Sequence, residues 1–176
     1  DDPMAIPLKV AVGEAERLTI DRQIDASSMI EAAVQIYRLR IENHTTLVSA
    51  EGSIAGVINI LHLFPEDSIR KGTGLLMERV DASNPSLQNL SNLQVAMLIN
   101  REFGFRDAID QARQVISVMR RLYPDGHTNV TSALLSYAEI CATFGESKAA
   151  LQAYVEVFRQ TKISAPESDS LSVIAG

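Results

Sequence analysis

Residues 134–154 read LLSYAEICATFGESKAALQAY, and this stretch predicts two helices joined by a turn. In its first half, apolar and small residues recur at the spacing of one buried helical face: Leu134, Tyr137, Ala138 and Cys141. The same spacing returns after Gly145 in Ala149, Ala150, Ala153, Tyr154, Val157 and Phe158. Because glycine favours the C-terminal cap of a helix, Gly145 marks the turn. The stretch therefore predicts a helical hairpin.

The same pattern extends over the rest of the chain. Sustained alternation of apolar and polar residues, which a half-buried strand would show, is missing, so the expected fold class is all-α. Proline and glycine divide the chain into about eight expected helices, near residues 5–21, 26–42, 46–63, 66–80, 86–102, 105–122, 128–143 and 147–162. Short connections predict a stack of antiparallel helical hairpins. Residues 5–163 would form one domain, and residues 164–176 a tail that frays or docks as a partial cap.

An internal repeat supports the stack. A shift of 42 residues brings apolar or small residues together at core positions: Val95 with Tyr137, Ala96 with Ala138, Ile99 with Cys141, Ala108 with Ala150, and Ala112 with Tyr154. A shift of 39 residues gives a weaker match upstream, for example Val57 with Ala96 and Ile69 with Ala108. A period in this range is typical of repeat arrays, whose units bury their faces only against neighbours.

Over residues 85–163 the chain resembles a tetratricopeptide repeat protein. The family's small residue in the first helix matches Ala138, and its turn glycine matches Gly145. In the second helix its small and aromatic residues match Ala150 and Tyr154. The repeat length and the segment Tyr123-Pro124-Asp125-Gly126-His127 are similar to the long repeats of the kinesin light chain type. The resemblance implies a solenoid of helical hairpins; the alternative is an ordinary helical bundle with fortuitous self-similarity.

In proteins of this family the first helix of each pair lines a concave groove, and the second forms the outer wall. The resemblance therefore implies a partner-binding groove lined by Gln94, Met97, Asn100, Arg101, Ser136, Glu139 and Thr143. Of these, we expect Gln94, Met97, Arg101, Glu139 and Thr143 to be at least partly exposed on one surface, with Ala96, Ile99, Ala138 and Cys141 buried behind them. Arg101 is either a solvated arginine or the anchor of an acidic group in the bound segment, through bidentate hydrogen bonds.

Composition narrows the class of partner. The chain has 176 residues and a net charge of −6, which opposes binding to nucleic acid. The mean hydropathy is +0.04, and without a run of about 18 uncharged apolar residues we expect no membrane insertion. Cys141 is the only cysteine, which excludes an internal disulfide and fits a cytoplasmic location. The expected partner is a protein or peptide, and homo-oligomer formation stays open.

Residues that could carry catalysis are few. His44, His62 and His127 lack a second His or Cys at helical ligand spacing, so no metal site is expected. Lys71-Gly72-Thr73-Gly74 lacks the phosphate-loop pattern, and we interpret it as a weak point in a helix. We therefore expect no cofactor and no enzyme activity. The leading hypothesis is a non-catalytic protein–protein interaction scaffold; the alternatives are a regulatory or assembly subunit buried in a larger complex or homo-oligomer, and an all-helical enzyme or ligand sensor.

Overall fold

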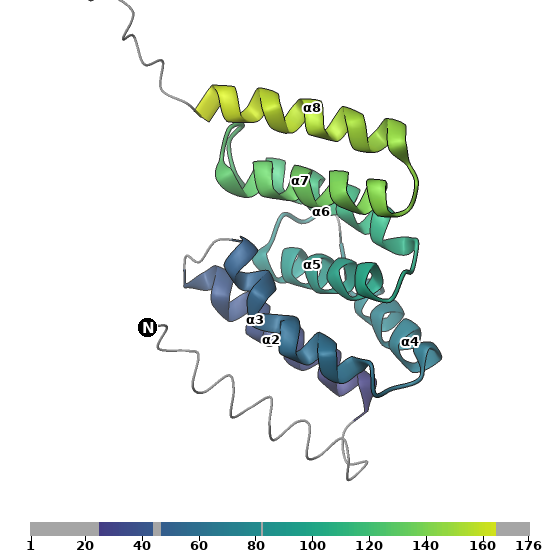
Figure 1. Ribbon diagram of the computed structural model, residues 1–176. Coiled ribbons are helices and arrows are strands. Elements are labelled where there is room, and N and C mark those ends of the chain that lie inside the picture. Colours follow the sequence, from purple (N-terminus) through teal and green to yellow (C-terminus); the bar gives the residue numbers. More distant parts are fainter. Residues whose placement is uncertain (1–24, 44–46, 82, 165–176) are drawn as a thin grey trace, which may run out of the picture.

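The computed structural model describes residues 25–43, 47–81 and 83–164 (Figure 1). The helix expected over residues 5–21 lies outside these ranges, as does the expected tail apart from Ser164. Nothing in the structure therefore bears on those two predictions.

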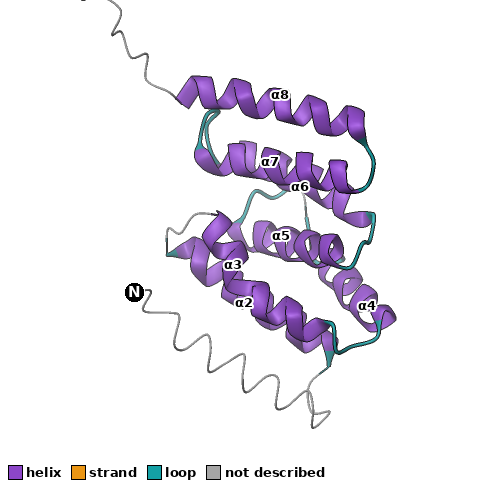
Figure 2. Ribbon diagram, in the orientation of Figure 1, coloured by secondary structure: helices purple, strands orange, loops and turns teal. Residues whose placement is uncertain are grey.

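The described part of the chain is helical throughout, with no strand (Figure 2). Its helices are α2 (Ala26–Glu42), α3 (Leu47–Leu61), α4 (Glu66–Met77), α5 (Leu87–Glu102), α6 (Asp107–Leu122), α7 (Thr128–Thr143) and α8 (Ser147–Ser164). The predicted all-α class is confirmed, and the predicted bounds differ from these by at most three residues at either end. Among the described helices, none is both long and apolar enough to cross a membrane.

The two C-terminal hairpins, α5–α6 and α7–α8, turn in the same way. Gly104 and Gly145 adopt φ angles of 70° and 78° after the first helix of each pair. The amide of Phe105 donates to the carbonyl of Asn100 at 2.7 Å, and the amide of Glu146 donates to the carbonyl of Cys141 at 2.8 Å. This is the Schellman arrangement, which needs a residue in the left-handed region and so favours glycine. The hairpins pack in sequence, because α6 contacts α7.

The structural repeat has a period of 41 residues rather than the predicted 42. Gly145 follows Gly104 by 41 residues, and both ends of α7 follow the ends of α5 by the same interval. The 42-residue register pairs buried Ala112 with exposed Tyr154, whereas a 41-residue register pairs it with buried Ala153. One residue rotates a helix by about 100°. Because α8 has small residues on adjacent faces, the 42-residue register matches the sequence pattern about as well as the 41-residue register does.

The N-terminal helices do not continue the predicted pairing. The weaker 39-residue match made α3 and α4 a hairpin, but α3 packs along α2, while α4 packs on α2 and α5. The reason is that α2 has one wide apolar face, formed by its buried residues Ala26, Met29, Ile30, Ala33, Val34, Tyr37 and Ile41. It can therefore cover α3, α4 and α5 at once, and α3 additionally contacts α5 and α7.

Helix α5 is consequently the centre of the molecule (Figure 1). It contacts α2, α3, α4 and α6, and every residue from Asn89 to Asn100 is buried. The buried amide of Asn89 is satisfied, because its Nδ2 donates to the carbonyls of Asp81 at 2.8 Å and Asn84 at 2.9 Å, in the loop before the helix. The segment from Leu87 to Asn100 contains no charged residue, as full burial requires.

A glycine in α4 permits its close approach to α2. A Cβ atom added to Gly72 would lie 2.6 Å from Cδ1 of the buried Ile30, whereas one added to Gly74 would meet nothing within 4 Å. The two glycines that we interpreted as a weak point thus have different roles. Gly72 is a packing position, and Gly74 is an exposed helix position.

Matched alanine variants of the two glycines should therefore behave differently. Gly74→Ala should raise the free energy of unfolding by about 0.5–1 kcal/mol through higher helix propensity. Gly72→Ala makes the same gain but forces Ile30 out of its rotamer, at about 0.5–1.5 kcal/mol, so it should give no net stabilisation. Urea unfolding of both variants measures this. Equal stabilisation by both would contradict the packing of α4 against α2.

Candidate functional site

Three of the seven predicted groove residues are not on an open face. Gln94 and Met97 are each 1% exposed, and Asn100 is 2% exposed. The prediction that Gln94 and Met97 are exposed is wrong, and Asn100 does not line an open groove, because α2, α3 and α4 enclose α5 together with α6. The residues expected to be buried behind them, Ala96, Ile99, Ala138 and Cys141, are buried.

The other four predicted groove residues remain accessible. Arg101 at the end of α5 is half-buried, and so is Ser136 on α7. Glu139 and Thr143 are exposed on α7. Arg101 and Glu139 both act on the pKa of Glu51 on α3, so three helices bring charged side chains together here. These accessible side chains of α3, α5 and α7 therefore form an open surface.

This surface contains an open cavity of about 310 Å³ between α3 and α5, which we call the Arg101 cavity. Its lining residues are Glu51, Gly52, Ala55, Ile58, Asn59, Leu98, Arg101 and Glu102. Ala55 and Ile58 supply accessible apolar surface, Leu98 is buried, and the remaining side chains are polar or charged. The volume is at the lower end for small-molecule sites, which suits one or two side chains of a peptide.

The guanidinium of Arg101 is available to a ligand. Within the described part of the chain it makes no hydrogen bond or ion pair, although its charge lowers the pKa of Glu51 on α3. The neighbouring Glu102 is engaged, because its Oε1 lies 3.4 Å from Nε2 of His62, whose ring packs on Phe103. The cavity thus offers a half-buried set of N–H donors above an apolar surface.

Glu51 is the perturbed carboxyl group of the cavity. Burial raises the pKa of Glu51 above its ordinary value of 4.5, attraction to Arg101 opposes the shift, and repulsion from Glu139 adds to it. A raised pKa in the folded state means that folding disfavours the ionised form. Glu51 therefore contributes most to stability at low pH, and this contribution is lost as the pH rises through its folded-state pKa.

Glu51→Gln should accordingly stabilise the protein in a pH-dependent way. Glutamine mimics the protonated carboxyl group, so the variant should have a higher Tm than the wild type at pH 7, with the difference vanishing well below pH 4.5. Thermal unfolding followed by circular dichroism across this range measures it. Glu78→Gln, at an exposed position after α4, is the control and should change Tm little at either pH. A Glu51→Gln variant less stable than the wild type at pH 7 would contradict the burial of this carboxylate.

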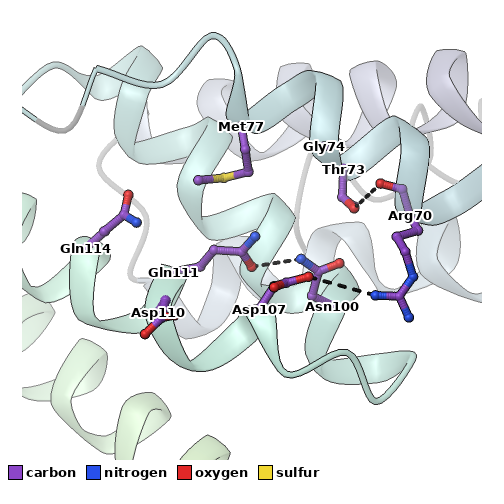
Figure 3. Close-up of a pocket in the computed structure, with 9 residues that line it drawn as sticks. All are labelled: Arg70, Thr73, Gly74, Met77, Asn100, Asp107, Asp110, Gln111 and Gln114. Atoms are coloured by element: carbon purple, nitrogen blue, oxygen red, sulfur yellow. Dashed lines mark hydrogen bonds and ion pairs between the residues drawn. The ribbon is translucent and has the colours of Figure 1, made fainter.

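A second open cavity, of about 370 Å³, lies among α4, α5 and α6 (Figure 3). At its base the Nδ2 of Asn100 donates to Oε1 of Gln111 at 2.9 Å, and Oδ1 of Asn100 has no partner. The predicted groove residue Asn100 therefore faces α6 instead of a groove. The charged side chains at the rim are paired: Nη1 of Arg70 lies 3.9 Å from Oδ2 of Asp107, and Nη1 of Arg113 lies 2.7 Å from Oδ1 of Asp110.

The second cavity is a gap in the packing of three helices, and the charged side chains at its rim are already paired with each other. Its two carboxylates are exposed and held by arginines, and the hydroxyl of Thr73 donates to the carbonyl of Arg70 in its own helix. No nucleophile lies beside a base there. Across residues 25–43, 47–81 and 83–164, no cluster of His, Cys, Asp and Glu could hold a metal ion. The Arg101 cavity is therefore the better candidate site.

The sequence analysis missed Leu98 and Glu102, which line the Arg101 cavity from α5, and Glu51, Gly52 and Asn59, which line it from α3. In the 41-residue register, Leu98, Arg101 and Glu102 on α5 correspond to Glu139, Ala142 and Thr143, which are exposed on α7. The signal that could have found the two α5 residues was the alignment of Gly104 with Gly145. Two glycines at equivalent helix ends fix a register more firmly than a pattern of small residues does.

His127 has a structural role at the start of α7. Its Nδ1 accepts a hydrogen bond from the amide of Asn129 at 3.1 Å, and its ring stacks on Tyr123 with 4.5 Å between centroids. His127 is therefore the N-cap residue of α7.

Comparison of the chain with protein-family models, curated proteins and solved structures gave no match. The resemblance to tetratricopeptide repeats therefore stays a prediction based on the residues quoted above. Function has to be argued from the geometry of the site.

Proposed function

We propose that this chain is a non-catalytic protein–protein interaction scaffold, which holds a peptide or helix of a partner at the Arg101 cavity. One observation carries the proposal: the half-buried guanidinium of Arg101 has no hydrogen bond or ion pair within the described part of the chain and lines an open cavity with apolar surface. Binding sites combine apolar surface with a few polar groups that fix orientation, and arginine is enriched among the residues that dominate interfaces.

The charges around Arg101 favour an uncharged acceptor in the ligand. Arg101 attracts the carboxylate of Glu51, and Glu139 is close enough to Glu51 to raise its pKa, so two negative charges already lie in this region. A carboxylate of a bound segment would gain attraction from Arg101 and repulsion from both glutamates, whereas a backbone or side-chain carbonyl oxygen is spared the repulsion. The bound segment would place an apolar side chain against Ile58 and Leu98 and a carbonyl oxygen at Arg101.

The neighbouring helix would extend the contact. Ser136, Glu139 and Thr143 lie on α7, which α3 contacts beside the cavity. A segment longer than one or two residues would reach these side chains. The proposal includes a cytoplasmic location, with which the buried free thiol of Cys141 is compatible.

A displayed library of random peptides, selected on the intact chain, tests the proposal. Peptides that depend on the cavity should lose about tenfold or more in affinity for Arg101→Gln, because hydrogen bonds to a charged group contribute about 1.5–3 kcal/mol. Lys71→Gln removes an exposed positive charge from α4 and should leave the affinity unchanged.

The same experiment separates the scaffold from its alternative. Failure to enrich any peptide, or equal binding to Arg101→Gln and the intact chain, would overturn the proposal. A solution mass that rises to that of a stable oligomer with concentration, together with such a failure, would favour an assembly subunit instead.

A further inference from the structure

Helix α8 presents an apolar stripe on the side that faces away from α7. Leu151 is 66% exposed, Phe158 is 61% exposed, and Val155 and Tyr154 are 46% and 41% exposed. The four positions follow the i, i+3, i+4, i+7 spacing of one helical face. The opposite face, with Ala150 and Ala153, is buried. Contiguous exposed apolar side chains of this kind are typical of interaction sites.

The charges on this face are all positive. Lys148 precedes the stripe and Lys162 follows it, with Nζ of Lys162 lying 4.7 Å from the ring centre of Phe158. The one acidic residue of α8, Glu156, is half-buried and turned toward α6, where its Oε1 lies 3.3 Å from Nη2 of Arg120. In a chain with a net charge of −6, this is an apolar face with a cationic border.

We propose that the outer face of α8 docks an acidic amphipathic helix of another protein. Side chains spaced at i, i+3, i+4 and i+7 are the pattern by which one helix recognises the apolar side of another. Acidic residues at the border of the partner helix would pair with Lys148 and Lys162. This surface is separate from the Arg101 cavity, so the inference goes beyond the proposed function and would make the chain a bridge between two partners.

Charge also argues against the other occupants of this face. In a symmetric antiparallel pair of α8 helices centred on Val155, Lys148 of one copy would face Lys162 of the other. These like charges would repel each other. An anionic membrane would attract α8 but repel the acidic remainder of the chain. An acidic helix matches both the apolar stripe and its border.

Synthetic helical peptides of about five turns provide the test. Three peptides share one leucine-rich apolar face and carry glutamate, lysine or glutamine on their borders. The glutamate peptide should bind the full chain in fluorescence anisotropy at least about tenfold more tightly than the lysine peptide, and the difference should shrink as salt rises from about 50 mM to about 500 mM. Phe158→Glu should abolish this preference. Leu63→Glu, which alters a leucine with 63% exposure outside α8, is the matched control and should keep it.

Several results would overturn the proposal. Equal affinity for the three peptides, or unchanged binding to Phe158→Glu, would exclude a cationic docking face on α8. A concentration-dependent dimer that Phe158→Glu abolishes would make a second copy the occupant. Binding to vesicles of phosphatidylglycerol, lost in Phe158→Glu, would make the occupant a membrane. Peptide binding that requires deletion of residues 165–176 would make that segment the occupant. Arg101→Gln should not affect any of these measurements. If the proposal for α8 is overturned, the proposal for the Arg101 cavity is therefore unaffected.

Discussion

Replacing Gln94 with glutamate should lower the free energy of unfolding by about 3–5 kcal/mol at pH 7. Gln94 is 1% exposed on α5, and its Oε1 has no hydrogen-bond partner. A carboxylate at this position would be buried without a compensating charge, which is among the most destabilising single changes known. Urea unfolding monitored by circular dichroism gives the value directly.

Gln94→Leu is the matched control at the same position. Leucine has a similar volume and removes the unsatisfied acceptor, so it should be neutral or stabilising. On an open groove, both variants would change stability by no more than about 0.5 kcal/mol. A small effect of Gln94→Glu would therefore contradict the enclosure of α5 and restore the groove that we expected from the sequence.

Ala138→Leu should lower the free energy of unfolding by about 1–3 kcal/mol. Ala138 is fully buried on α7, where this helix packs against α6 and α8. The extra methyl groups would force the helices apart or drive neighbouring side chains off their rotamers. The Tm of the variant should fall accordingly.

Ala142→Leu provides the comparison for Ala138→Leu. It lies one turn further along α7 at an exposed position, so the same change in volume should alter stability by about 0.5 kcal/mol or less. If both variants unfolded at the wild-type temperature, the small residues of α7 would not mark close helix contacts. The family resemblance, which depends on Ala138, would then lose its physical basis.

Local features of the fold were predictable because they depend on neighbouring residues. Gly104 and Gly145 end the first helices of two hairpins through the same backbone hydrogen bonds, and such turns can be recognised from a single glycine after an apolar face. Ser86 caps α5 by accepting a hydrogen bond from the amide of Asn89 at 3.2 Å. These local signals explain why the predicted helix bounds agree closely with the observed ones.

The packing of the first three described helices could not be predicted in this way. Which helices cover α5 depends on the wide apolar face of α2, which also contacts α3 and α4, and on the gap that Gly72 leaves for Ile30. Both are contacts between residues more than forty positions apart. A periodicity argument assumes that consecutive helices pair, and here α3 pairs with α2 while α4 packs elsewhere.

The candidate site was predicted in part for the same reason. Arg101 and Glu139 were expected on one surface, and both act on Glu51 in the structure. Gln94 and Met97 were misplaced because the expected groove left out the packing of α2 and α3 on α5. The absence of charge from Leu87 to Asn100 was visible in the sequence and indicated burial of α5.

The most direct test of the scaffold account is to map a bound peptide on the isotope-labelled chain by NMR. A library-selected peptide is titrated into the protein while the amide signals are followed. The account predicts that the largest changes in chemical shift fall on Gly52, Ala55, Leu98 and Arg101, which line the cavity between α3 and α5. Changes confined to the cavity among α4, α5 and α6, or spread evenly over the chain, would contradict it.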